Sequence, residues 1–266
     1  MLDFNHRLKV HEQVESLIDA ALLAERAAQP PRNYLGASRL GVACERALQY
    51  EYAGAPVDED KAFDGRRLRI FEVGHTFEDL AIRWLRLAGF DLRTTAADGQ
   101  QFGFAVADGR IAGHCDGIIV HGPAELGWSY PMLWECKSMA DKPWRDCVKR
   151  GVTLSKPVYA AQMALYQAYL HDGGKALMPG GQTAEGIGLA DHPALFTAIN
   201  KDTQAIWCEL VPFDGALAQR MSDRGVRVVR ATEAGELLPR GFSQDTHVEC
   251  RMCNYSMRCW SQGGVA

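Results

Sequence analysis

The spacing of apolar residues predicts helices over much of the chain. Side chains three or four positions apart share one face of a helix, and apolar residues recur at this spacing in several long stretches. Pro30 and Pro31 end the first stretch, and Gly89 ends the third. The predicted helices cover residues 10–28, 38–52, 65–88, 140–150, 157–171 and 214–232.

Shorter apolar runs between these helices predict β-strands. The dipeptide Asp108-Gly109 is typical of a tight hairpin turn and separates the first two runs. The Gly-rich stretch 172–193 is expected to form a surface loop. The order of helices, strands, a helix, strands and a last helix predicts an α/β fold with a helical N-terminal cap. The predicted strands cover residues 102–106, 110–120, 131–137, 195–199 and 205–211.

Length and composition favour a single folded domain in the cytoplasm. A chain of 266 residues, with 47% hydrophobic and 23% charged residues, is long and apolar enough to form its own core. No apolar run approaches the roughly 20 residues of a membrane span, and residues 1–13 lack the apolar segment of a signal peptide. We therefore expect no membrane partner. Because the net charge is −4, a surface for nucleic acid would have to be a local patch.

A carboxylate and a Glu-x-Lys motif stand on successive predicted strands. Side chains alternate across a strand, so Glu135 and Lys137 share one face while the side chain of Cys136 points the other way. Together with Asp116 they can converge on one point and offer the hard oxygen ligands that Mg²⁺ and Mn²⁺ prefer. Lys137 could then orient a water or neutralise charge on a phosphate. Taken alone, Glu-x-Lys is also typical of an ion pair at an exposed strand edge.

The residues that flank this pair resemble the RecB-type branch of the PD-(D/E)XK nucleases. That family has, in order, a helical Gly-x-x-x-His or Glu, an Asp, a Glu-x-Lys and a Gln-x-x-x-Tyr. Many relatives carry His where Glu78 falls, whereas this chain has its histidine at His75, on the same helix face. The register favours Glu78. The matching residues are Gly74, Glu78, Asp116, Glu135, Lys137, Gln162 and Tyr166.

The resemblance implies a core sheet flanked by helices and metal-dependent hydrolysis of DNA, by an exonuclease rather than an endonuclease. Lys137 would activate or orient the water, and Gln162 and Tyr166 would support the site. The alternatives are a non-catalytic DNA-binding or assembly subunit with a vestigial site, and a structure-selective endonuclease. The implied ligands of Mg²⁺ or Mn²⁺ are Glu78, His75, Asp116, Glu135 and the backbone carbonyl of Cys136.

The C-terminal segment carries three clustered cysteines, Cys250, Cys253 and Cys259. In a reducing compartment such a cluster indicates a metal site, and a tetrahedral thiolate site needs a fourth ligand. The chain resembles the iron–sulfur nucleases, which comprise CRISPR-associated exonucleases and AddB-type nuclease domains, and this resemblance supplies Cys44 as the fourth ligand. It implies a [4Fe–4S] cluster, although four thiolates also suit zinc.

The expected organisation is one nuclease domain with three parts. Residues 1–64 would form the helical cap, 65–232 the nuclease core, and 233–266 a tail that closes the cluster with Cys44. Joining segments so distant in the chain would restrict the unfolded state. The implied partners are DNA and proteins of recombination, repair, phage DNA processing or CRISPR adaptation.

A local excess of positive charge follows the Glu-x-Lys motif. Residues 137–156 contain six lysines and arginines against Asp141 and Asp146. Cations with an aromatic side chain among them suit phosphate contacts and base stacking, although a solvated helix face is the ordinary alternative. Lys201, at the last predicted hairpin turn, could extend this surface. The candidate DNA-binding residues are Lys142, Trp144, Arg145, Lys149, Arg150 and Lys156.

Overall fold

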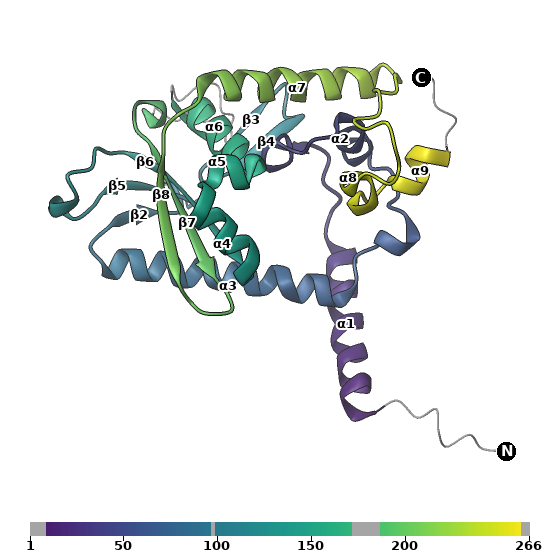
Figure 1. Cartoon of the computed structure of the whole chain (residues 1–266), viewed down its shortest axis with the longest axis horizontal. Coiled ribbons are helices and arrows are strands. Elements are labelled where there is room, and N and C mark those ends of the chain that lie inside the picture. The colour runs from purple at the N-terminus through teal and green to yellow at the C-terminus, as the bar shows by residue number, and fades with distance from the viewer. Residues whose placement is uncertain (1–8, 97–98, 172–186, 262–266) are drawn as a thin grey trace.

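The computed structural model describes residues 9–96, 99–171 and 187–261, so most of the predicted loop 172–193 lies outside the described residues. Helices pack around two β-sheets, which confirms the predicted α/β class (Figure 1). The α-helices are α1 (Val10–Ala28), α2 (Glu45–Tyr52), α3 (Gly65–Leu87), α4 (Asp141–Arg150), α5 (Val152–Ser155), α6 (Pro157–His171), α7 (Gly215–Glu233), α8 (Val248–Met252) and α9 (Ser256–Ser261). The strands are β1 (Leu35–Gly36), β2 (Asp91–Arg93), β3 (Gly103–Val106), β4 (Ile111–His114), β5 (Gly117–His121), β6 (Met132–Met139), β7 (Ala194–Asn200) and β8 (Ile206–Val211).

The larger sheet has the strand order β2-β5-β6-β7-β8, in which β6 and β7 run parallel and the other neighbours run antiparallel. Alternate residues of β6 face two separate cores. Trp134 and Cys136 pack with Ala81 of α3, whereas Leu133 packs with Met163 of α6. The sheet is therefore covered by α3 on one face and by α6 on the other, and α7 lies against α6 (Figure 1).

The prediction of one continuous strand over 110–120 is wrong. β4 ends at His114 and pairs with β3 in the smaller sheet, whereas β5 begins at Gly117 and pairs with β6 in the larger one. Cys115 and Asp116 form the crossing between the two sheets. Both strands are apolar, so the hydrophobic pattern runs through the crossing and could not indicate it.

The second predicted helix begins later than expected. A short 3₁₀ turn covers Ala37–Arg39, and α2 starts only after Cys44, its N-cap residue. Between them Gly41 lies against α6, where a Cβ atom would come within 2.7 Å of the Val158 Cα. This close approach leaves no room for a side chain at residue 41.

The cap and the C-terminal tail contact each other directly. The backbone N–H of Asp58 donates to the Asn254 carbonyl at 2.8 Å, and its carboxylate accepts from the Met257 N–H at 2.7 Å. The Arg46 guanidinium donates to the Leu238 carbonyl. These contacts hold α8 and α9 beside α2, while α7 runs from the sheets to this region (Figure 1).

Among the described helices, none is long and apolar enough to cross a membrane.

Candidate active site

The point where β5 and β6 part brings the predicted carboxylates together. The last antiparallel pair on this side is Gly117 with Trp134. Asp116 directly precedes β5 and Glu135 directly follows Trp134 on β6, so the two stand opposite one another just beyond this pair. The Cys136 N–H donates to Asp116 Oδ2 at 2.8 Å, which fixes the aspartate against β6.

Lys137 lies between these two carboxylates. Its ammonium group pairs with Glu135 Oε1, lies 3.6 Å from Asp116 Oδ2 and donates to the Cys136 carbonyl at 2.9 Å. The Tyr159 ring centroid lies 5.6 Å from Lys137 Nζ. The carbonyl of Cys136 therefore faces the site, while its side chain is buried against α3 as the alternation predicts.

Helix α6 supplies the support on the other side of Glu135. The amide of Gln162 donates to Glu135 Oε1 at 2.7 Å and lies 3.4 Å from the Tyr166 hydroxyl. Glu135 has no exposed surface, and Gln162 and Tyr166 are buried. Gly113 on β4 makes room for this arrangement, because a Cβ atom there would come within 2.6 Å of the Tyr166 ring.

The charges in this group are poorly balanced. Burial and then the charge of Asp116 raise the pKa of Glu135 to about 8. The same two causes, in the same order, raise the pKa of Glu78 to about 7. Burial opposes the charged form of Lys137, but Glu135 and Asp116 raise its pKa and keep the ammonium protonated. Of these four side chains, three are acidic and one is basic, so a further cation would be favoured here.

Two observations bear on whether a metal ion fits. Glu135 Oε2 is buried and has no hydrogen-bond partner in the described structure, so one strong oxygen donor is available. Within the described ranges, no three Asp, Glu, His or Cys side chains are close enough to enclose an ion as they stand. The donor set is nevertheless composed of the carboxylate and carbonyl oxygens that suit Mg²⁺ and Mn²⁺.

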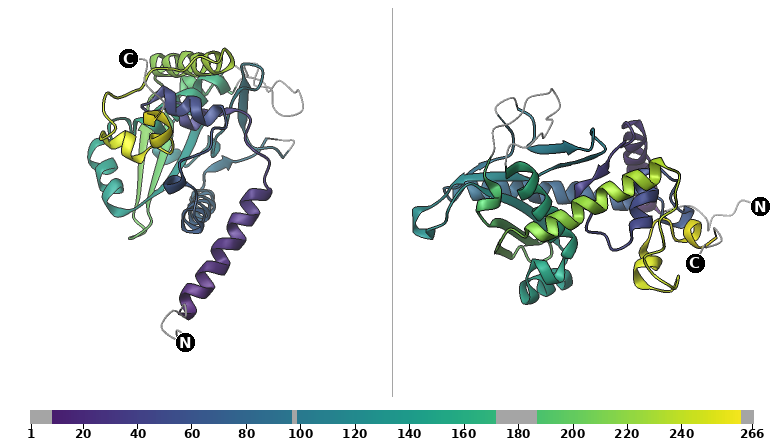
Figure 2. Two further views of the ribbon diagram at one scale, coloured as in Figure 1. Left: turned by 90° about the vertical axis from the view of Figure 1, so that its right-hand side faces the viewer. Right: turned by 90° about the horizontal axis from the view of Figure 1, so that it is seen from above.

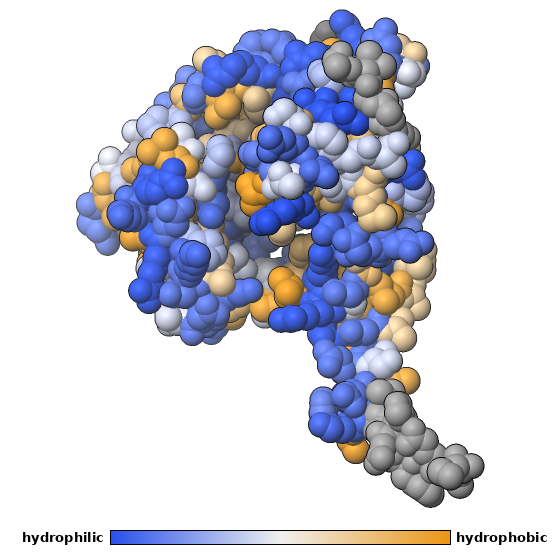
Figure 3. Space-filling model, turned by 45° about the vertical axis from the view of Figure 1, so that its right-hand side comes forward, coloured by the Kyte–Doolittle hydropathy of each residue, from blue (hydrophilic) through white to orange (hydrophobic). Residues whose placement is uncertain are grey.

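A cleft of about 690 Å³ opens beside this group, between α3 and the end of β6. Glu78 and Lys137 line it, and so does His75. The His75 side chain is 81% exposed and lies 4.0 Å from the carboxylate of Glu78, which is 29% exposed. Glu78 is the more buried of the two, and it is the one whose pKa the charge of Asp116 raises. The space-filling view shows the surface hollowed between the sheets and the tail (Figure 3).

Sequence reasoning missed two cations of the cleft. Arg66 and Arg69 of α3 line it together with Lys201 and Tyr159. A signal was present, because Arg66 and Arg69 stand three residues apart and so share one face of the helix. Without a site to attach it to, that spacing is indistinguishable from a solvated helix face.

The predicted DNA-binding residues occupy α4 and the segment after it, outside the described lining of the cleft. Lys142 and Lys149 are exposed. Arg145 pairs with Asp141 at 2.8 Å, and Arg150 lies 3.5 Å from the carboxylate of Asp146. The remaining cation of the set, Lys156, is half-buried just before α6.

The position of Trp144 does not favour the predicted stacking on bases. Its indole N–H donates to the Ala198 carbonyl at 3.0 Å, and its ring packs against the main core. The half-buried ring thus covers part of β7. The sequence showed an aromatic residue among cations but not which side of α4 meets the sheet.

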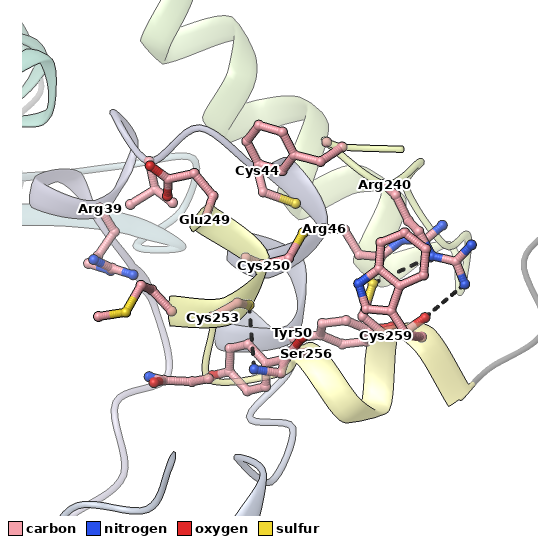
Figure 4. A pocket seen from close by; sticks show the side chains of 18 residues that line it. Arg39, Cys44, Arg46, Tyr50, Arg240, Glu249, Cys250, Cys253, Ser256 and Cys259 are labelled. Atoms are coloured by element: carbon pink, nitrogen blue, oxygen red, sulfur yellow. Dashed lines mark hydrogen bonds between the residues drawn. The ribbon is translucent and has the colours of Figure 1, made fainter. Parts of the chain in front are cut away.

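The four predicted cluster ligands line a second cavity of about 320 Å³, which we call the cysteine cavity (Figure 4). Cys44 comes from the start of α2, Cys250 from α8, Cys253 from its end and Cys259 from α9. Arg46 and Arg240 are among the other lining residues.

Polar groups surround the sulfur atoms of this cavity. The Tyr255 N–H lies 3.4 Å from Cys253 Sγ, and an Arg46 nitrogen lies 3.8 Å from Cys259 Sγ. Burial raises the pKa of the Cys253 thiol, and the neighbouring Cys44 adds to this effect. Gly241 belongs to the predicted tail, and a Cβ atom there would lie 3.1 Å from Cys44 Sγ. The tail thus passes directly over the first cysteine.

Comparisons with known proteins find matches among solved structures. No family model and no curated protein matches the chain. Among solved structures it is similar to SSO0001, with 16% identity and a TM-score of 0.49 over 96% of this chain and 100% of that chain. It is similar to an alkaline exonuclease (LHK-Exo) from Laribacter hongkongensis, with 14% identity and a TM-score of 0.47 over 81% and 93%. The values for LHK-Exo in complex with dAMP are 14% and 0.44 over 83% and 93%. Likeness at this level leaves the function to be argued from the site.

Proposed function

We propose that this protein is a metal-dependent DNA nuclease that acts as an exonuclease. The observation that carries the proposal is the meeting of Asp116, Glu135 and Lys137 where β5 and β6 part. Two carboxylates, a protonated lysine and a buried carboxylate oxygen without a partner form a donor set for a divalent cation beside an open cleft.

Glu78, Asp116, Glu135 and the carbonyl of Cys136 would hold Mg²⁺ or Mn²⁺. Such an ion supplies Lewis-acid stabilisation of phosphate charge and makes a bound water a better nucleophile. Glu78 is favoured over His75 because it is the more buried of the two and because its pKa responds to Asp116.

The side chains around the ion have separate tasks. Lys137 stays protonated between Glu135 and Asp116, so its ammonium can orient the water and offset charge on the phosphate. In the reaction the water oxygen bonds to phosphorus, the P–O ester bond breaks and the leaving oxygen takes up a proton. Gln162 positions Glu135 through its 2.7 Å hydrogen bond, and the buried Tyr166 backs Gln162.

DNA would enter through the cleft of α3. Arg66 and Lys201 line it and can contact phosphates next to the scissile bond, whereas the guanidinium of Arg69 is already paired with Glu15 and Asp19. The exposed Lys142 and Lys149 of α4 would contact more distant phosphates. Trp144 has no assigned part in this path, because its half-buried ring packs against the core.

The cysteine cavity would hold a [4Fe–4S] cluster, with zinc as the alternative. Four thiols and three arginines, against the single carboxylate of Glu249, around about 320 Å³ suit an anionic group larger than one ion. A zinc ion, with Zn–S bonds of about 2.3 Å, would draw the sulfurs into a smaller space. Either group would clasp Cys44 to the tail and so hold the cap against α8 and α9.

Digestion of end-labelled DNA tests the proposal. Linear single- and double-stranded DNA should release labelled nucleotides with Mg²⁺ or Mn²⁺ and none with EDTA, while closed circles should persist. Lys137→Ala should stop the release, whereas Lys61→Ala, which removes a lysine paired with Asp60 away from the cleft, should not. Release that survives EDTA, absence of release with either metal, or an active Lys137→Ala would overturn the proposal. Cleavage of circles would make the protein an endonuclease instead.

A further inference from the structure

Helix α1 is amphipathic, yet it has no buried residue. It extends away from the rest of the molecule (Figure 2). It meets α3 through charges, since Glu15 and Asp19 pair with Arg69, and the Arg26 guanidinium lies 4.1 Å from the Phe63 ring centroid. The polar side of α1 therefore faces the protein. Its apolar side is left to solvent, where apolar residues are visible next to the grey N-terminal atoms (Figure 3).

Most of the exposed apolar residues of α1 form a regular stripe, and Leu23 lies outside it. Their spacing alternates between four and three positions, which is the seam of a two-stranded coiled coil. Val10 is 76% exposed and Leu17 is 72% exposed, values far from those of a satisfied surface helix. Glu15 and Asp19 fall on the opposite side of this repeat. The stripe consists of Val10, Val14, Leu17, Ala21, Ala24 and Ala28.

The stripe is large at one end and small at the other. Its first half contains two valines and a leucine, and its second half contains only alanines. In a parallel pair, alanines would face alanines and leave that half loosely packed. In an antiparallel pair centred near Asp19, every large side chain faces a small one. The facing pairs would be Val10 with Ala28, Val14 with Ala24 and Leu17 with Ala21.

The residues beside the stripe favour the same arrangement. An antiparallel pair has a two-fold axis, at which Ile18, 45% exposed, meets its counterpart. Towards the ends, His11 would face Glu25 of the partner subunit, so an imidazole donor meets a carboxylate. The remaining acidic residues of α1 lie away from the seam.

We propose that α1 is a dimerisation helix that binds α1 of a second copy of this chain in antiparallel orientation. The contact is isologous and closes on itself, so it produces dimers rather than fibres. It is independent of the proposed nuclease function, because none of its residues lines the cleft or the cysteine cavity as described.

Light scattering of the full chain tests the dimer. The wild type should have twice the 29.4 kDa mass of one chain. Leu17→Glu should have the mass of one chain, because a charge in the seam of both helices cannot be paired. Ser16→Glu adds the same charge at the neighbouring position but outside the seam, about 120° round the helix, and should remain dimeric. A monomeric wild type, which would leave the stripe to a different protein, or a dimeric Leu17→Glu would overturn the proposal.

Cysteine cross-linking tests the orientation. Ile18→Cys lies at the two-fold axis and should form an interchain disulfide on mild oxidation, with the wild type as the blank for native cysteines. Val14→Cys should not, because antiparallel packing separates the two copies by ten residues, about 15 Å along the helix. Since disulfides need Cα atoms within about 7 Å, cross-linking of Val14→Cys alone would show a parallel pair and overturn the proposed orientation.

Discussion

The candidate active site and the cysteine cavity hold their reactive groups in opposite ways. Asp116 and Glu135 sit one step beyond a strand pair, so the hydrogen-bond ladder of β5 and β6 sets their separation. The cysteines of the cavity lie on short helices and their ends, and a few polar contacts such as Asp58 with Met257 hold these segments together.

This difference separates chemistry from stability. A side chain on a ladder can be changed without moving the backbone that carries it, so substitutions at the carboxylates should alter activity more than folding. The cap and tail have little regular structure between them, so their stability depends on the group that joins Cys44 to the tail. Each of the following predictions tests one side of this contrast.

The largest expected effect is on cleavage. Glu135→Gln keeps an oxygen that can accept from Gln162 and Lys137 but removes the carboxylate charge. The initial rate on linear DNA should fall at least about 100-fold, while the thermal unfolding midpoint changes little. Glu125→Gln, an exposed glutamate in the turn between β5 and β6, is the matched control. A variant rate equal to the wild type would remove Glu135 from the site.

The cysteine cavity should show the reverse behaviour. Cys44→Ser should lose its metal, and its free energy of unfolding should drop by roughly 2–4 kcal/mol because the clasp between cap and tail is open. Metal analysis and denaturant unfolding of anaerobically purified protein measure both effects. Iron with a brown colour identifies the cluster, and a colourless protein with zinc identifies the alternative.

The control for that measurement is Cys208→Ser. Cys208 is exposed on β8 and is not one of the cavity residues, so its variant should keep both metal and stability. Full metal occupancy in Cys44→Ser would contradict the clasp.

A smaller effect should distinguish the cleft from α4. Arg66→Ala or Lys201→Ala should each reduce the slope of log K against log salt by roughly 0.7–0.9, because each phosphate contact releases counterions. The change at Arg150→Ala should be smaller, since its guanidinium already contacts Asp146 and the Leu154 carbonyl, the latter at 3.0 Å. Salt titrations of DNA binding in EDTA measure these slopes. A larger change at Arg150 would place the DNA on α4 instead.

The smallest effect concerns the join between cap and core. Arg227, followed by Arg224, lowers the pKa of Glu45, so ionised Glu45 stabilises the folded state. This stability is fully present above the ordinary glutamate pKa of about 4.3 and is lost as the pH falls through the lowered value. Because the pair is partly exposed, its loss should cost less than about 1 kcal/mol. Glu45→Gln should lower the free energy of unfolding near neutral pH and remove this part of its decrease at acid pH. Denaturant unfolding as a function of pH measures both effects. The same decrease at acid pH in the variant and in the wild type would contradict the prediction.

The sequence predicted helices and strands correctly where the spacing of apolar residues along one buried face is regular. Helix α6 has the predicted bounds, and α3 ends one residue early. The break at Cys115 and Asp116 was beyond sequence reasoning, because an apolar strand looks the same whether it stays in one sheet or crosses to another. That break places Asp116 opposite Glu135, so the missed feature is the one that assembles the site.

The candidate site shows the same division. The order of Asp116, Glu135, Lys137 and Gln162 along the chain was visible as a resemblance, and the structure brings these residues together. The position of Trp144 was not visible in the sequence, because only the packing of α4 on β7 shows that its ring lies half-buried against the sheet.

By itself the sequence determined which residues carry charge, thiol or apolar surface, and which of them share the face of one helix or strand, since these are local properties. Only the tertiary structure decided which faces meet. It placed Glu78 where the charge of Asp116 raises its pKa, brought Cys44 to the three C-terminal cysteines around one cavity, and left the apolar stripe of α1 uncovered. Such pairings depend on contacts between segments far apart in the chain, whose free energies depend on the packing of the whole molecule.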